Sequence, residues 1–153
     1  MKNPVLLLDL DGVLITTPPW KADEIHTDGY SAFNINCVNN LNVLLTELDF
    51  DIWLSSTRRT QKTITEFNQI FTNRGIIKPI TGFVPVFQYC KNRREELMRF
   101  LDENKISNFL IIDDDKSLNN LPDNMKQNLI STELLKGFDI EKLELSLQII
   151  KRV

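Results

Sequence analysis

The stretch LLLDLDGV at residues 6–13 decides the fold, because a short apolar run ends there in two acids and a glycine. Residues 4–10 therefore predict a buried strand. Side chains two positions apart in a strand face the same way, so Asp9 and Asp11 start on one side. Two carboxylates this close repel each other, and a hard cation such as Mg²⁺ with oxygen ligands relieves that repulsion. A hairpin turn would explain Gly12, but it would not explain why Asp9 interrupts the apolar run.

Beyond this strand the chain alternates between short apolar runs and segments with helical spacing of apolar residues. Further strands are predicted over residues 50–54, 80–87, 109–112 and 128–131, and helices over residues 35–48, 60–73, 92–103 and 140–150. Such alternation is typical of βα units and a mostly parallel sheet. Ligands of these sheets bind beyond the carboxyl ends of the strands, where this chain places polar clusters at residues 9–11, 55–57 and 113–114.

Taken alone, the late cluster Asp113-Asp114-Asp115 fits more than one kind of structure. It could be a polar strand end that leads into a helix cap at Ser117. A Walker B strand looks similar, but the chain has no Gly-rich phosphate loop with Gly-Lys-Ser/Thr, which excludes a P-loop nucleotidase. A two-component receiver domain carries its acidic pair after the first strand and its phosphoacceptor later. The order of the clusters here excludes that class.

In combination the clusters resemble the motifs of the haloacid dehalogenase (HAD) superfamily. Residues 9–13 match its first motif, DxDG[TV], and Ser56, Lys91 and Asp113-Asp114 follow in the order of the other three. A closer resemblance is to the HAD domain associated with Swiss Army Knife RNA-repair proteins, with the patterns DxDGV, SSxxR and DDD. The resemblance covers about residues 5–140. It implies an α/β, three-layer Rossmann-like HAD fold with a mostly parallel sheet.

The resemblance also implies a Mg²⁺-dependent phosphomonoester hydrolase that acts through an aspartyl-phosphate. Asp9 would be the nucleophile, and Asp11 would protonate the leaving oxygen and then activate water. Mg²⁺ would bind Asp9, the backbone carbonyl of Asp11, Asp114 directly and Asp113 through water. Spontaneous hydrolysis of phosphate monoesters is among the slowest known reactions, which gives such crowding of charge a purpose.

The remaining site residues come from the weaker motifs. By resemblance, Ser56 and the amides after it would donate hydrogen bonds to the phosphoryl oxygens, and Lys91 would stabilise Asp9 and the developing charge. Ser55 and Lys78 stay open as alternatives for these two roles. Substrate binding is further expected from Gly12, Thr57 and Arg58. The Arg58 guanidinium could bind a phosphate through two parallel hydrogen bonds, or it could be an ordinary surface charge.

The spacing between motifs leaves no room for the cap domain that HAD enzymes for small molecules commonly carry. Only residues 14–50 separate the first motif from the second strand, and residues 59–90 hold one helix and one strand. We therefore expect one capless HAD-like catalytic domain over residues 1–153, with an enlarged flap at residues 15–33. An open site admits macromolecular ends. A phosphorylated nucleic-acid end is thus one predicted substrate, a small phosphorylated metabolite or a phosphoprotein is the alternative, and a catalytically idle binding module is the rival class.

Several features bear on a nucleic-acid substrate. Six basic residues follow strand ends near the site and suit a polyanion, although basic helix starts are also ordinary surface: Arg58, Arg59, Lys62, Lys91, Arg93 and Arg94. Trp20 and Tyr30 in the flap are candidate stacking surfaces. The net charge of −3 is no obstacle, since without the five clustered acids 16 acidic residues face 18 basic ones.

Composition limits the remaining possibilities. The chain has 153 residues, 42% hydrophobic and 25% charged, which excludes disorder and fits one domain. Its apolar runs fall far short of the roughly 18 residues that span a bilayer, and no secretory leader is visible. Cys37 and Cys90 are too few for a disulfide framework. A cytoplasmic monomer with reduced thiols and no membrane partner is expected.

Overall fold

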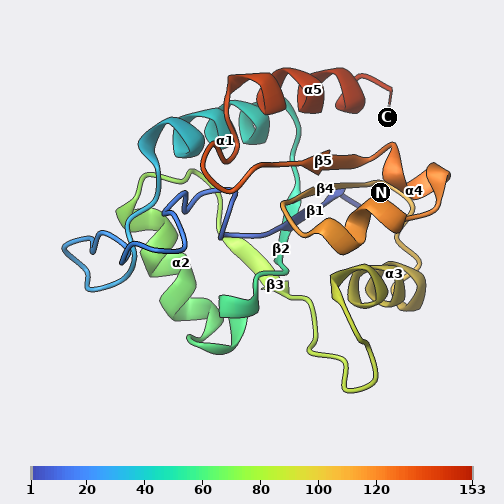
Figure 1. Ribbon diagram of the computed structural model, residues 1–153. Coiled ribbons are helices and arrows are strands. Elements are labelled where there is room, and N and C mark those ends of the chain that lie inside the picture. Colours follow the sequence, from blue (N-terminus) through green and yellow to red (C-terminus); the bar gives the residue numbers. More distant parts are fainter. Residues whose placement is uncertain (1, 153) are drawn as a thin grey trace.

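A computed structural model describes residues 2–152 as a five-stranded parallel sheet covered by helices (Figure 1). The strand order is β3-β2-β1-β4-β5, and each neighbouring pair is parallel. The strands are β1 (Val5–Leu8), β2 (Asp51–Leu54), β3 (Ile80–Phe83), β4 (Phe109–Asp113) and β5 (Leu129–Ser131). All five strands predicted from the sequence are present, and β1 lies at the centre of the sheet.

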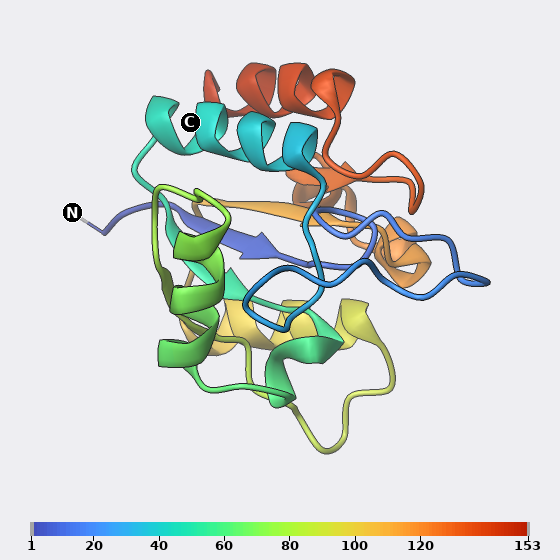
Figure 2. The same ribbon diagram turned by 90° about the vertical axis from the view of Figure 1, so that its left-hand side faces the viewer.

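Helices cover both faces of the sheet and complete three layers. The helices are α1 (Ile35–Glu47), α2 (Ile64–Asn73), α3 (Arg93–Glu103), α4 (Asp123–Lys126) and α5 (Ile140–Ile150), with 3₁₀ turns η1 (Thr57–Thr60) and η2 (Lys116–Asn120). Leu6 and Leu8 of β1 face a core shared with α1, α2 and α5, whereas Leu7 faces a core shared with α3. Figure 2 shows α1 and α5 on the side of the sheet opposite α3. The predicted α/β, Rossmann-like fold class is confirmed.

The strand register brings the ends of three strands into one row. Leu8 pairs with Leu54 on one side and with Ile112 on the other. The next residues, Asp9, Ser55 and Asp113, therefore lie next to one another at the carboxyl ends of β1, β2 and β4. Because side chains alternate along a strand, this row continues the Leu7 side of the sheet, which α3 covers.

Three predicted elements are clearly shorter than expected. The strand predicted over residues 4–10 runs only from Val5 to Leu8. The strand expected over residues 80–87 ends at Phe83, and Pro85, which has no N–H to donate, follows shortly after. The helix expected from residue 60 begins at Ile64, because Thr63 caps it in a capping box with Glu66, while Ser56 caps the separate turn η1. Three short elements, η1, α4 and η2, were not predicted.

The segment between β1 and α1 is irregular over residues 9–34, apart from isolated bridges such as Ile25 with Ser31. No helix or strand of an inserted domain lies in these described residues, and the single capless domain expected from the spacing stays a prediction. No helix in the described part of the chain is long and apolar enough to cross a membrane.

Candidate active site

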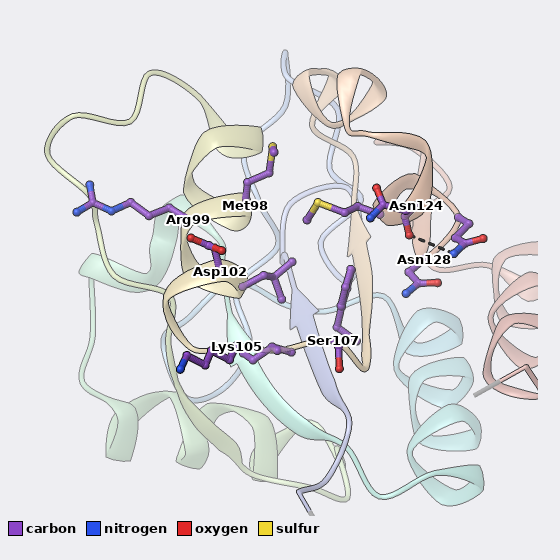
Figure 3. A pocket seen from close by; sticks show the side chains of 12 residues that line it. Met98, Arg99, Asp102, Lys105, Ser107, Asn124 and Asn128 are labelled. Carbon is purple, nitrogen blue, oxygen red and sulfur yellow. Dashed lines mark hydrogen bonds between the residues drawn. The ribbon is translucent and has the colours of Figure 1, made fainter.

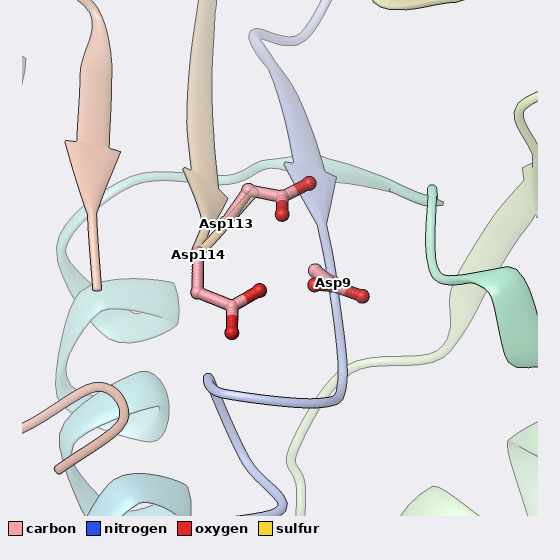
Figure 4. A group of neighbouring side chains, drawn as sticks. All are labelled: Asp9, Asp113 and Asp114. Carbon is pink, nitrogen blue, oxygen red and sulfur yellow. The ribbon is translucent and has the colours of Figure 1, made fainter. Parts of the chain in front are cut away.

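Three carboxylates converge at the carboxyl ends of β1 and β4 (Figure 4). One oxygen from each of Asp9, Asp113 and Asp114 lies within 4.8 Å of the others. The side chains of Asp9 and Asp113 are 6% and 0% exposed, and Asp114 is half-buried. Burial, and then the charge of Asp113, raise the pKa of Asp9 well above its usual range, and the same causes raise the pKa of Asp114. Three ionised carboxylates are therefore unfavourable here unless positive charge lies close to them.

One buried guanidinium partly neutralises this cluster. Arg93, the first residue of α3, donates from Nη1 to Asp113 Oδ2 at 2.6 Å and lies 3.8 Å from Asp9 Oδ1. Three carboxylates and one guanidinium leave two negative charges uncompensated when all are ionised. Because Mg²⁺ prefers oxygen ligands and carries two positive charges, the residues present fit this ion.

At Gly12, which follows Asp9 and Asp11, there is no room for a side chain next to the carboxylate cluster. Gly12 has a φ of +76°, and a Cβ built there would overlap the Asp114 carboxylate. The backbone oxygen of Gly12 accepts a hydrogen bond from the buried Thr132 hydroxyl at 2.6 Å. A glycine at this position therefore allows the backbone of the loop after β1 to lie directly against the Asp114 side chain.

Asp11, the second acid of the first motif, lies in different surroundings. Its side chain is 41% exposed and forms a bidentate pair with Arg58, in which Nε and Nη2 each donate to one carboxylate oxygen at 2.9 Å. The Asp11 carboxylate is not part of the three-acid group. That its backbone carbonyl is a metal ligand stays a prediction.

Comparison with known proteins shows the family of the chain. The family model of the HAD domain in Swiss Army Knife RNA repair proteins matches residues 5–143. The chain belongs to this family. The match and the parallel sheet confirm the resemblance and the HAD fold inferred from the sequence, and they place the chain among HAD-type hydrolase domains. No curated protein and no solved structure matches the chain significantly.

In this HAD domain the cation beside the acids is Arg93, and not Lys91 as the order of motifs suggested. Lys91 is exposed and precedes the N-cap Asn92, so it lies outside helix α3. Lys78 pairs with Asp49, at the amino ends of the strands and far from the acids. The sequence did hold a signal, since Arg93 shares the buried stripe of Leu97 and Phe100 at helical spacing.

The structure also distinguishes the two serines of the second motif. The Ser56 hydroxyl accepts the Arg58 N–H at 3.1 Å and caps η1. Ser55 is 1% exposed, and its Oγ is the one buried side-chain oxygen or nitrogen of residues 2–152 that has no hydrogen-bond partner. Ser55 thus has an unused hydroxyl in the row beside Asp9, while Thr57 is exposed at the start of η1.

The basic surface expected near the site is smaller than the sequence suggested. Arg59 is 5% exposed and donates to the carbonyls of Val84, Ser55 and Ser56 and to Glu96. Since Arg58 and Arg93 are bound to acids within the protein, three of the six basic residues are not free to follow a polyanion. Lys62, Lys91 and the half-buried Arg94 remain.

The two flap aromatics differ in exposure. Tyr30 is 9% exposed and packs edge-on against Phe67, so the expected stacking of a base on Tyr30 is wrong for this structure. Trp20, by contrast, is 81% exposed on the outer limb of the flap. Only Trp20 of this pair is available to a nucleic-acid base.

A cavity of about 860 Å³ lies between α3 and α4, away from the acids (Figure 3). Met98, Phe109 and Met125 are among its lining residues, and it opens at the amino ends of β4 and β5. None of its lining residues belongs to the acidic site. The chemistry-bearing residues are thus at the opposite end of the sheet from this cavity.

Proposed function

We propose that this HAD domain is a Mg²⁺-dependent phosphomonoester hydrolase that forms an aspartyl-phosphate on Asp9. The observation that carries the proposal is the convergence of Asp9, Asp113 and Asp114 within 4.8 Å beside a single guanidinium. A binding module has no need of buried, repelling carboxylates, whereas phosphoryl transfer needs a nucleophile and a cation at one point.

Asp9, Asp113 and Asp114 would hold the ion. When bound, Mg²⁺ would offset the repulsion between an anionic nucleophile and an anionic phosphate. Arg93 would keep Asp113 fixed through their 2.6 Å hydrogen bond, so that the acids keep their geometry during the reaction.

The chain's own residues supply the rest of the chemistry. The Leu10 N–H donates to Asp9 Oδ1 at 2.8 Å, which orients the carboxylate for attack on phosphorus. As the Asp9–phosphorus bond forms, the ester P–O bond breaks, and the leaving oxygen takes a proton from Asp11. Water then attacks phosphorus and gives a proton to Asp11, which releases Asp9 and inorganic phosphate. The unpaired Ser55 hydroxyl would donate to a phosphoryl oxygen throughout.

As substrate we propose the phosphorylated end of a nucleic acid. The absence of an inserted cap in residues 2–152, the exposed Trp20 and the occurrence of this family in RNA repair proteins support this choice. Because few basic residues remain free, we expect the end nucleotide to be recognised mainly by stacking and only weakly by backbone charge.

Phosphate release in the presence of Mg²⁺ tests the proposed reaction. Wild-type protein should hydrolyse p-nitrophenyl phosphate, and Asp9→Asn should reduce the rate by on the order of 10⁴-fold, as expected when a nucleophile is removed. Asp102→Asn, which changes an exposed acid of α3 away from the acidic cluster, is the matched control and should retain activity. Equal inertness of wild type and Asp9→Asn toward a broad panel of phosphate esters would favour the idle binding module.

The substrate class has its own test. An oligonucleotide with a 3′- or 5′-phosphate should be hydrolysed better than the matching mononucleotide, and Trp20→Ala should remove much of that advantage. Raising salt to about 200 mM should have only a small effect, because few phosphate contacts are expected. Equal turnover of mononucleotides or sugar phosphates would favour a small metabolite instead.

A further inference from the structure

Arg58 has no free hydrogen-bond donor. A guanidinium carries five N–H groups, and all are used: Nε and Nη2 donate to Asp11, and Nη2 also donates to Asp23 Oδ2 at 2.8 Å. Nη1 donates to the Ser31 hydroxyl at 3.1 Å and, over a longer 3.5 Å, to the Tyr30 hydroxyl. A substrate phosphate could bind Arg58 only by displacing one of these partners.

The flap residues that hold Arg58 are themselves fixed. The Ser31 hydroxyl donates to Asp23 Oδ2 at 2.7 Å, and the Tyr30 hydroxyl donates to Gln61 at 2.9 Å. Ser31 and Tyr30 are 7% and 9% exposed, so this limb of the flap is part of the protein interior. The network therefore links the flap rigidly to Asp11 through one arginine.

We propose that Arg58 is a positioning residue that orients the Asp11 carboxyl for proton transfer, and that Asp23 of the flap holds Arg58 in place. This inference rests on the proposed function and differs from the expectation that Arg58 binds substrate. The flap then acts as a fixed support for Asp11 instead of a lid that closes over a ligand.

The geometry explains why Asp11 needs such support. With 41% of its side chain exposed, Asp11 lacks the packing that fixes the buried Asp9. The bidentate pair occupies one lone pair on each Asp11 oxygen and leaves others to carry the proton. In the first step this proton passes from Asp11 to the leaving oxygen as the P–O bond breaks, and in the second Asp11 takes a proton from the attacking water. Misplacement of such a group by about 1 Å can cost on the order of 100-fold in rate.

Two substrates with different leaving groups test this role. p-Nitrophenolate departs without being protonated, whereas the sugar oxygen of a nucleoside 3′-monophosphate needs a proton from Asp11. Arg58→Lys, which keeps the charge but loses the fork, and Asp23→Ala should lower the single-turnover rate of the first phosphoryl transfer from the nucleotide about 100-fold. On p-nitrophenyl phosphate the rate of the same step, followed as the burst of p-nitrophenolate, should change by less than about threefold, because this leaving group needs no proton. The substrate concentration that gives half the maximal rate of that step should stay unchanged for both esters.

Glu24→Gln is the matched control, because Glu24 is an exposed acid of the same flap, next to Asp23, and its side chain is not among the partners of Arg58. It should leave the ratio of the two activities unchanged. Ser31→Ala removes one acceptor of Arg58 and should give a milder form of the selective loss, which keeps the test decisive if a stronger variant fails to fold.

Each alternative outcome overturns the inference in a recognisable way. A higher half-saturating substrate concentration with an unchanged rate of the first step would show that Arg58 binds substrate, and equal losses in the rate of the first step on both substrates would indicate general loosening. If Asp23→Ala behaves like the wild type, the flap does not hold Arg58 in place for proton transfer. A wild-type protein inert toward both esters would instead refute the proposed function, and the inference with it.

Discussion

Two charged clusters lie within a few residues of each other in the first motif, yet they are built differently. Around Asp9, three carboxylates cluster beside one guanidinium, which contacts the two that are almost fully buried, Asp9 and Asp113. Around Asp11, the carboxylates of Asp11 and Asp23 share Arg58, whose donors are all used, and Asp11 is partly exposed. The first cluster has one positive charge beside three carboxylates, whereas in the second every N–H of the guanidinium has an acceptor.

The difference teaches what each cluster is suited to do. Buried carboxylates with raised pKa values are unfavourable on their own, and a divalent cation would stabilise them. All N–H groups of Arg58 already have acceptors, so a ligand would form no additional hydrogen bond with it. Because its two carboxylate partners, Asp11 and Asp23, come from separate segments, Arg58 holds these segments in a fixed position relative to each other. We therefore assign ion binding to the Asp9 cluster and positioning to the Asp11 cluster, and the following experiments probe that contrast.

The largest expected effect comes from removing each cluster's arginine. Without metal, Arg93→Met leaves three clustered carboxylates with no cation and should lower the free energy of unfolding by about 3–5 kcal/mol. Arg58→Met should cost less, about 1–3 kcal/mol, because Asp11 can be solvated. Urea unfolding in the presence of a chelator measures both changes. Equal losses would mean that the two clusters do not differ in burial as described.

The next effect concerns the glycine under Asp114. Gly12→Ala should weaken Mg²⁺ binding by about 10–100-fold, because the new methyl group displaces a carboxylate of the ion site. Gly29→Ala is the matched control: its φ of +87° gives similar backbone strain, but a Cβ there meets nothing within 4 Å. Calorimetric titration separates the two. Equal affinities in both variants would place the ion away from Asp114.

The local parts of this design could be predicted from the sequence. Asp9, Gly12 and Asp113-Asp114 follow directly after apolar strands, so strand alternation and the topology of a parallel sheet suffice to bring them together. The same reasoning predicted all five strands and four of the five helices, since each depends mainly on short-range apolar spacing.

The remaining residues depend on information that short-range patterns do not contain. The choice of Arg93 over Lys91 follows from where α3 begins, and a shift of two residues turns a surface cation into a buried one. The contrast between Ser55 and Ser56 depends on the exact register of β2 with β1. The link from Asp23 to Arg58 joins residues 35 positions apart through an irregular segment without periodicity. No local rule predicts such a pairing.

A smaller effect is expected within the acidic run after β4. Asp114→Asn should weaken Mg²⁺ binding by at least about tenfold, since it removes a charged ligand of the proposed site. Asp115→Asn should leave the affinity unchanged, because Asp115 accepts hydrogen bonds from the Ser117 N–H and hydroxyl and caps η2, a role that Asn also fills. Similar losses in both variants would show that the ligand has been misassigned.

The smallest effect is the pH dependence of stability, in which the two clusters have opposite signs. The pKa of Asp9 is raised, so the metal-free folded state binds its proton more tightly than the unfolded state; this stabilisation is complete at low pH and is lost as pH rises through the raised pKa. The pKa of Asp23 is lowered, first by the Ser31 hydroxyl and then by Arg58, so its stabilisation is present at neutral pH and is lost as pH falls. The free energy of unfolding, measured by urea titration with a chelator from about pH 3 to about pH 8, should therefore pass through a maximum. Its slope should be at most about 1.4 kcal/mol per pH unit for each proton.

Two variants and the metal ion test which cluster sets each side of this maximum. Asp9→Asn should flatten the alkaline side, and Asp23→Ala should flatten the acid side. Mg²⁺ should oppose the loss of stability at alkaline pH because it binds the deprotonated cluster. If Asp9→Asn leaves the alkaline side unchanged, the buried acids do not set it, and the Asp9 cluster does not carry the uncompensated charge on which the ion site depends.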